Sequence, residues 1–122
     1  MKSCHALALL GVLLGGVACS VDIPAREARQ LVAQGALLLD VRTPSEFAER
    51  HVPGAVNIPV EQLKQRLSEV GPRGREVVVY CHSGARAGVA AMMLRKAGYS
   101  HVHNLGAMAR WSRDYDAWPA LQ

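Results

Sequence analysis

Cys81 begins the segment of this sequence with the clearest capacity for covalent chemistry. The segment runs from Cys81 to Arg86 (CHSGAR) and directly follows the apolar run Glu76–Tyr80. A tight loop between a strand and a helix points successive backbone N–H groups inward, and such a row binds negative charge. The start of the helix and the cation of Arg86 favour a thiolate on Cys81. The segment therefore predicts nucleophilic catalysis in which the sulfur carries a covalent intermediate.

The cysteine count supports a reactive role for this thiol. The chain has three cysteines, Cys4, Cys19 and Cys81. The alternative for Cys81 is that it serves only as a small buried apolar residue, as a lone cysteine often does. The position of Cys81 between a strand and a Gly-containing loop favours the nucleophile over that alternative.

The apolar pattern predicts the strands that position this loop. Ala36–Val41 and Glu76–Tyr80 are nearly continuous apolar runs, as in strands covered on both faces. The segment His51–Pro59 forms a turn that leads into another short strand, and His101–Leu105 forms the last one.

Helices are predicted between these strands. One begins at Asp22-Ile23-Pro24, with Asp22 as the N-cap. A second begins at Thr43, where Glu46 completes a capping box. Helical spacing of apolar residues also covers 60–70 and 86–97.

Alternation of strands and helices predicts an α/β fold, in which a parallel sheet has helices on both faces. Ligands bind at the carboxyl ends of strands in such sheets, and Cys81 lies at one of these ends. Asp40 and Arg42 lie at another, and we interpret them as an ion pair that supports the loop rather than as groups that touch substrate.

The first residues differ in composition from the rest. Lys2 precedes the uncharged apolar segment Ala6–Ala18, which is shorter than the roughly 20 residues of a membrane-spanning helix. We therefore expect a signal peptide at 1–18 and a single domain at 19–122, which places the protein outside the cytoplasm, in a bacterial periplasm. Cys19 follows small residues and is a candidate for lipidation, which would anchor the domain to a membrane. An uncleaved anchor helix is the alternative.

Composition narrows the partners. The 122 residues carry a formal net charge of +4, which suits a small anionic substrate. Basic residues are scattered rather than clustered with aromatic ones, so we expect no nucleic-acid binding. His101 and His103 lie two residues apart without an evident third ligand, so no metal site is predicted.

Three motifs resemble the rhodanese family, especially the single-domain periplasmic rhodaneses of the phage-shock-protein E kind. They are LLLDVRTPSEFAERHVPGAVNIP, VVVYCHSGARA and HNLGAMARW. The resemblance implies a parallel sheet of about five strands and a persulfide on Cys81, with no metal or cofactor. It also implies that Asp40 and Arg42 support the site, and that the persulfide is held by His82, Ser83, Gly84, Ala85 and Arg86.

The resemblance further implies a sulfurtransferase that moves sulfur from an anionic donor such as thiosulfate to cyanide or a thiol. A non-enzymatic persulfide carrier that delivers sulfur to a partner protein is the alternative. Phosphatases related to this family have five residues between the cysteine and the arginine, whereas this chain has four, which disfavours phosphate. The chain departs from the family at His82, where arginine is frequent, and at Ala107, where glycine is frequent.

Overall fold

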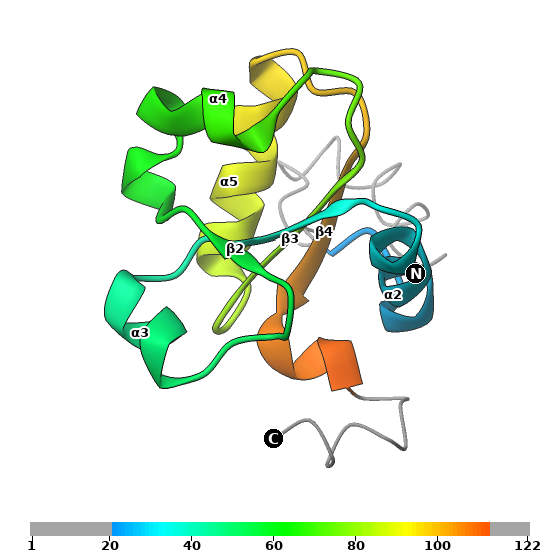
Figure 1. Ribbon diagram of the computed structural model, residues 1–122, viewed down its shortest axis with the longest axis vertical. Coiled ribbons are helices and arrows are strands. Elements are labelled where there is room, and N and C mark those ends of the chain that lie inside the picture. The colour runs from blue at the N-terminus through cyan, green and yellow to red at the C-terminus, as the bar shows by residue number, and fades with distance from the viewer. Residues whose placement is uncertain (1–20, 113–122) are drawn as a thin grey trace, which may run out of the picture.

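A parallel sheet lies at the centre of the computed structural model, which describes residues 21–112 (Figure 1). The sheet order is β2-β1-β3-β4, and all three strand pairs are parallel. The strands are β1 (Leu37–Asp40), β2 (Val56–Asn57), β3 (Val77–Cys81) and β4 (Val102–Ala107). The predicted signal peptide at 1–18 and the lipidation candidate Cys19 lie outside the described residues.

The described part of the chain contains four strands rather than about five, which corrects the number implied by the resemblance. The segment before α2 does touch the outer edge of β4. The amide of Asp22 donates to the carbonyl of Asn104 at 3.0 Å. Pro24 follows two residues later and has no N–H to continue such a ladder.

The two central strands are buried along their whole length, as their apolar runs predicted. Every residue of β1 and of β3 is buried. Residues at alternate positions then supply two separate cores. One core contains Leu39, Val79 and Cys81, and the other contains Leu38 and Tyr80.

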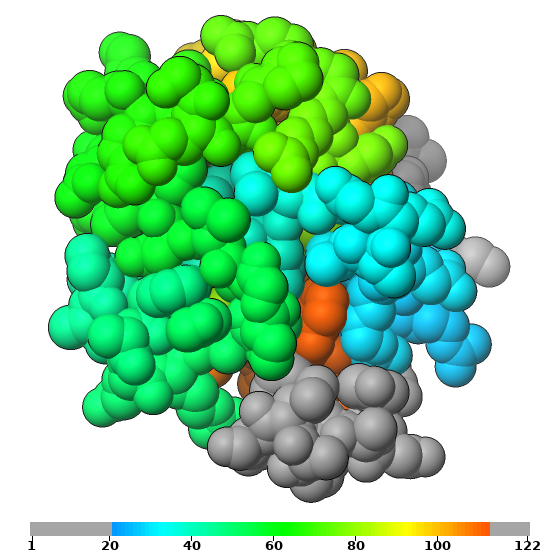
Figure 2. Space-filling view, in the orientation of Figure 1, coloured from blue at the N-terminus to red at the C-terminus, as the bar shows by residue number. Residues whose placement is uncertain are grey.

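Helices cover both faces of the sheet, as predicted. On one face, α5 (Ala85–Lys96) packs through the buried residues Ala87, Ala90, Ala91 and Leu94. On the other, α2 (Ala25–Ala33) and η3 (Met108–Ser112) pack through Ala28 and Trp111. Figure 1 shows α4 (Leu67–Val70) and α5 on one side of the strands and α2 on the other. Figure 2 shows the orange surface of the last segment between the blue α2 and the green residues of the middle of the chain.

The N-cap prediction for α2 was wrong. Pro24 occupies the N-cap position of α2 and makes no side-chain cap hydrogen bond. The carboxylate of Asp22 instead accepts from the amide of Asn104 at 2.6 Å and from Arg95 at 2.5 Å. The Asp22 side chain therefore binds residues of β4 and α5 instead of capping α2.

The capping box of α3 (Pro44–Glu49) is confirmed. The Thr43 hydroxyl accepts from the amide of Glu46 at 3.2 Å, and the Glu46 carboxylate accepts from the amide of Thr43 at 3.0 Å. This exchange fixes the start of the helix and holds the side chain of Glu46 in place.

The continuous helix predicted at 60–70 was wrong. The segment is divided into η1 (Val60–Gln62), η2 (Lys64–Arg66) and α4 (Leu67–Val70). Arg66 interrupts it, with φ −117° and ψ 25°. Leu63 is nevertheless fully buried and Leu67 packs, partly buried, against the same core, so the predicted apolar face is confirmed although packing overrode the helical pattern. Within residues 21–112, no helix is long and apolar enough to cross a membrane.

Candidate active site at the Cys81 loop

Cys81 is the last residue of β3, and Arg86 is the second residue of α5. The turn from His82 to Gly84 joins them, so the structure has the strand, loop and helix that the sequence predicted. Cys81 is fully buried, whereas His82, Ser83 and Ala85 are exposed. The sulfur atom therefore lies at the base of a loop whose outer side chains face solvent.

Gly84 provides the direct contact between this loop and the sulfur. Its backbone N–H donates to the Cys81 Sγ at 2.9 Å. Gly84 has φ +113° and occupies the N-cap of α5, a left-handed conformation that residues with a Cβ rarely adopt. Glycine at this position thus allows the turn that aims an N–H at the sulfur beside the positive end of a helix.

Arg86 lies in this first turn of α5 and is held by a carboxylate from another helix. Its Nη1 donates to Glu46 Oε1 at 2.7 Å, and its Nη2 donates to Glu46 Oε2 at 3.0 Å. Such a two-bond arrangement fixes the plane of the guanidinium. The hydrogen bond to Glu46 chiefly raises the pKa of Arg86, and the neighbouring Cys81 is among the smaller causes.

Glu46 is the site residue that the sequence reasoning missed. It was interpreted as a capping residue, which it is, but the same carboxylate also binds Arg86 across 40 positions of sequence. The hydrogen bond from Arg86, followed by that from the Thr43 backbone, holds the pKa of Glu46 well below its ordinary value. The capping motif signalled that this side chain is ordered, but no local pattern pairs positions so distant.

Asp40 and Arg42 form a buried ion pair at the end of β1. Arg42 Nη2 donates to Asp40 Oδ2 at 2.6 Å, and its Nε donates to Asp40 Oδ1 at 3.0 Å. Arg42 Nη2 also donates to the carbonyl of Arg50 at 2.6 Å. These bonds join β1 to Arg50, the residue directly after α3, the helix that carries Glu46.

Tyr80 extends this buried network towards Cys81. The guanidinium of Arg42 lies 5.7 Å from the centre of the Tyr80 ring. The Tyr80 hydroxyl accepts from the amide of Val52 at 3.1 Å, which fixes the turn before β2. Burial, followed by the neighbouring Asp40, raises the pKa of Tyr80, so the hydroxyl stays protonated. Since Tyr80 directly precedes Cys81, this network anchors the strand end that carries the sulfur.

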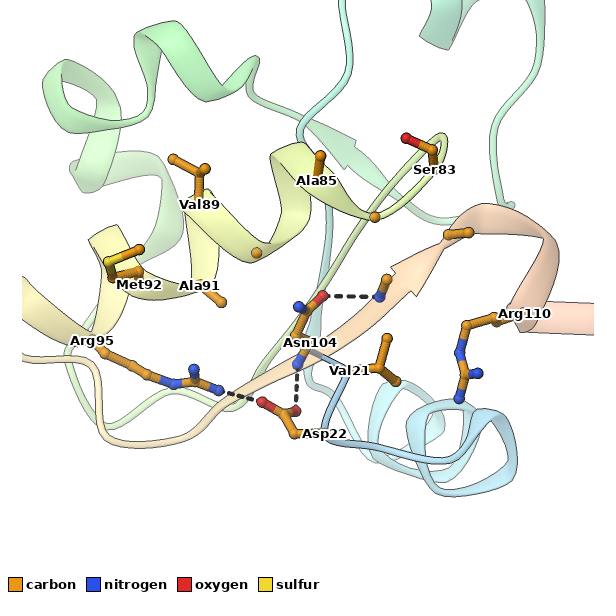
Figure 3. A pocket seen from close by; sticks show the side chains of 14 residues that line it. Val21, Asp22, Ser83, Ala85, Val89, Ala91, Met92, Arg95, Asn104 and Arg110 are labelled. Atoms are coloured by element: carbon orange, nitrogen blue, oxygen red, sulfur yellow. Dashed lines mark hydrogen bonds and ion pairs between the residues drawn. The ribbon is translucent and has the colours of Figure 1, made fainter. Parts of the chain in front are cut away.

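A pocket of about 650 Å³ borders the loop at Ser83, Gly84 and Ala85 (Figure 3). Ser83 and Ala85 lie on one side of it, and Arg95 and Asp22 lie on the opposite side. Cys81, His82 and Arg86 are not among its lining residues. The pocket therefore adjoins the loop without containing the sulfur.

His101 and His103 lie at the opposite end of β4 from the loop. His103 Nε2 lies 2.7 Å from Glu76 Oε1, and His101 Nδ1 lies 3.9 Å from the other carboxylate oxygen. Across residues 21–112, no three or more His, Cys, Asp or Glu side chains are grouped so that they could hold a metal ion.

Comparison with known proteins agrees with this architecture. Residues 24–114 match the rhodanese-like domain. A sulfurtransferase from Allochromatium vinosum is 38% identical over 94 residues, which cover 76% of this chain and 87% of that protein. The thiosulfate sulfurtransferase PspE of Escherichia coli is 39% identical over 71 residues, which cover 57% of this chain and 68% of PspE.

Solved structures show the same fold. The human single-domain sulfurtransferase TSTD1 superposes with a TM-score of 0.70 at 30% identity, covering 81% of this chain and 100% of the human one. A rhodanese from E. coli, solved with anions, gives a TM-score of 0.59 at 36% identity and covers 62% of this chain and 91% of that one. This chain belongs to the rhodanese-like family, within which it is similar to single-domain sulfurtransferases.

Proposed function

We propose that the protein transfers a sulfane sulfur from thiosulfate, or from a related anionic donor, to cyanide or a thiol through a persulfide on Cys81. In the first step, the Cys81 thiolate attacks the outer sulfur of thiosulfate. The new Sγ–S bond forms as the S–S bond of thiosulfate breaks, and the bonding electron pair leaves with sulfite. The enzyme then carries Cys–S–S⁻.

The second step returns the enzyme to its starting state. The carbon of cyanide attacks the outer sulfur of the persulfide, and the electron pair of the persulfide bond returns to Cys81 Sγ. Thiocyanate leaves, and the charges balance in both steps without a metal or an external reductant. A thiol acceptor would take the sulfur in the same way and leave as a persulfide.

The hydrogen bond from Gly84 N–H to Cys81 Sγ at 2.9 Å carries this proposal. A backbone donor beside the start of α5 stabilises negative charge on sulfur, and the same loop can turn its other N–H groups towards the outer sulfur of a persulfide. His82, Ser83, Gly84 and Ala85 form the proposed cradle, and Arg86 is the cation of its far side. Asp40 and Arg42 support it from β1.

The mass of the intact protein tests the persulfide. The wild type and Cys81→Ser are incubated with thiosulfate, freed of excess donor and weighed before and after cyanide is added. We expect the wild type alone to gain one sulfur atom and to lose it as thiocyanate. A chain that gains no sulfur from thiosulfate or from a protein persulfide would contradict the proposal.

Turnover distinguishes the enzyme from a dedicated sulfur carrier. An enzyme releases many equivalents of thiocyanate per Cys81, whereas a carrier loads one sulfur and releases it only to its partner protein. We expect multiple turnovers with thiosulfate and cyanide, and their loss in Cys81→Ser.

We also propose that the domain acts outside the cytoplasm, because a basic residue and a short apolar segment precede it. Expression of the full chain in a bacterium, followed by cell fractionation, tests this. Mass spectrometry of the mature N-terminus would then distinguish an unmodified Cys19 from a lipidated one after cleavage at Ala18. Retention of an intact segment 1–18 in the cytoplasm would contradict the proposal.

A further inference from the structure

Arg86 is the cation nearest the proposed cradle in sequence, yet it does not act as an isolated charge. Both of its terminal nitrogens donate to the Glu46 carboxylate, at 2.7 and 3.0 Å. A full negative charge therefore lies within contact distance of the full positive charge. Since Coulomb energies add, a donor anion in the cradle experiences the difference between them.

We propose that Glu46 sets the net charge of the Cys81 site and thereby determines how strongly the site distinguishes donors by their charge. The donor class rests on the proposed function, whereas the effect of Glu46 on the charge at Cys81 does not. The negative charge of Glu46 then weakens the attraction between Arg86 and a dianionic donor. The N–H groups of the loop supply most of the binding energy for the donor.

The position of Glu46 does not depend on its bonds to Arg86. Oε1 also accepts from the Thr43 amide at 3.0 Å and lies 3.0 Å from the Thr43 hydroxyl, as part of the capping box. A neutral glutamine in the same place would retain an oxygen acceptor for the Thr43 amide and for one N–H of Arg86. The helix therefore needs an acceptor at this position, and the negative charge is a separate property of the residue.

That charge is permanent in the working range of pH. The hydrogen bond from Arg86 keeps the pKa of Glu46 well below its ordinary value, so the carboxylate remains ionised at neutral pH. The pair is also partly accessible, with 32% of the Glu46 side chain and 33% of the Arg86 side chain exposed. Its field therefore reaches a ligand that enters from solvent, weakened by screening.

Alkylation of Cys81 measures this charge without any sulfur transfer. The full chain is treated with iodoacetate, which is an anion, or with iodoacetamide, which is neutral, and modification is quantified on the peptide that contains Cys81. The ratio of the two rates cancels the reactivity of the thiolate and leaves the local potential. We expect Glu46→Gln to raise the ratio by about threefold to tenfold, since it removes the negative charge that offsets Arg86 at this site.

Two further variants separate charge from structure. Glu49→Gln makes the same change on the exposed end of α3 and should leave the ratio at its wild-type value. The double variant Glu46→Gln/Arg86→Gln removes both charges, so its ratio should return towards the wild type. An unchanged ratio in Glu46→Gln, or an equal rise in Glu49→Gln, would overturn the inference.

Donor kinetics extend the test to the proposed reaction. Thiosulfate carries two negative charges and methanethiosulfonate carries one, in anions of similar size. Because Coulomb energy is linear in ligand charge, the fall in KM for thiosulfate in Glu46→Gln should be the square of the fall for methanethiosulfonate. Equal changes for both donors, or a rise in both KM values, would contradict the inference. If neither donor loads sulfur on the wild type, the proposed function fails, and the alkylation ratio still decides the role of Glu46.

Discussion

Two arginine–carboxylate pairs flank the Cys81 loop, and they differ chiefly in burial. In the Asp40–Arg42 pair the side chains are 0% and 4% exposed, whereas in the Glu46–Arg86 pair they are 32% and 33% exposed. Both have short contacts, at 2.6 and 2.7 Å. Similar contact geometry therefore occurs in two very different dielectric environments.

The difference in burial implies that one pair mainly stabilises the fold and the other mainly sets the charge near Cys81. A buried pair whose partner is removed leaves an uncompensated charge in the interior, so its loss is costly for folding. A partly exposed pair contributes about 0–1 kcal/mol, because solvent and salt screen it. Changing one member of the Asp40–Arg42 pair should therefore destabilise the fold. Changing the charge of the Glu46–Arg86 pair should leave the fold largely stable.

Removal of Asp40 should give the largest effect. We expect Asp40→Ala to lower the free energy of unfolding by about 3–5 kcal/mol, because Arg42 is left buried without its partner. Urea denaturation measures this. The double variant Asp40→Leu/Arg42→Met should recover much of the loss, and a single variant as stable as the wild type would show that the pair is not effectively buried.

Tyr80→Phe should give the next largest effect, on the same buried side of the comparison. The variant keeps the ring beside Arg42 but removes the hydroxyl that accepts from the Val52 amide. We expect a loss of about 1–3 kcal/mol, since a buried N–H is left unsatisfied. Urea denaturation and amide exchange at Val52 measure it, and unaltered protection of that amide would contradict the prediction.

Thr43→Ala probes the more exposed side. It removes the hydroxyl that caps α3 but leaves the Glu46 carboxylate and its bonds to Arg86. We expect a loss of about 1 kcal/mol in the free energy of unfolding, as for other cap removals, with the alkylation ratio of Cys81 unchanged. A changed ratio would mean that the cap, rather than the charge, controls the site.

The smallest stability effect is expected from Glu46→Gln, and it should depend on pH. The pKa of Glu46 is lowered in the folded protein from a reference value of 4.5, so ionised Glu46 favours folding above that pH. As the pH falls below 4.5, the unfolded state binds a proton that the folded state refuses, and the advantage of Glu46 declines. The difference in stability between wild type and Glu46→Gln should therefore shrink from pH 7 to pH 3. Urea denaturation at both values checks this, and a difference that widens towards acid would have the wrong sign.

Local sequence was sufficient for the elements that their own residues determine. The apolar run of β3, the capping box at Thr43 and the glycine before α5 each act within a few residues, so strand, cap and loop could be predicted. Asp22 and Glu46 show where this reasoning ends. Asp22 was predicted to cap α2, but its carboxylate binds the amide of Asn104 in β4. Glu46 was predicted only to cap α3, but it also binds Arg86 in α5. In both cases a contact between distant segments adds to or replaces the local one. The fifth strand came from family resemblance alone, and the residue pattern itself contained four.

The two pairs also differ in the length of chain that each one closes. Asp40 and Arg42 are two positions apart, whereas Glu46 and Arg86 are separated by 40. The first contact therefore costs almost no loop-closure entropy, whereas the second requires α3 and the start of α5 to be brought together across that span. If the bond to Arg86 is absent from the folding transition state, its removal should speed unfolding far more than it slows refolding. The charge beside Cys81 thus depends on two segments that only the folded chain brings together.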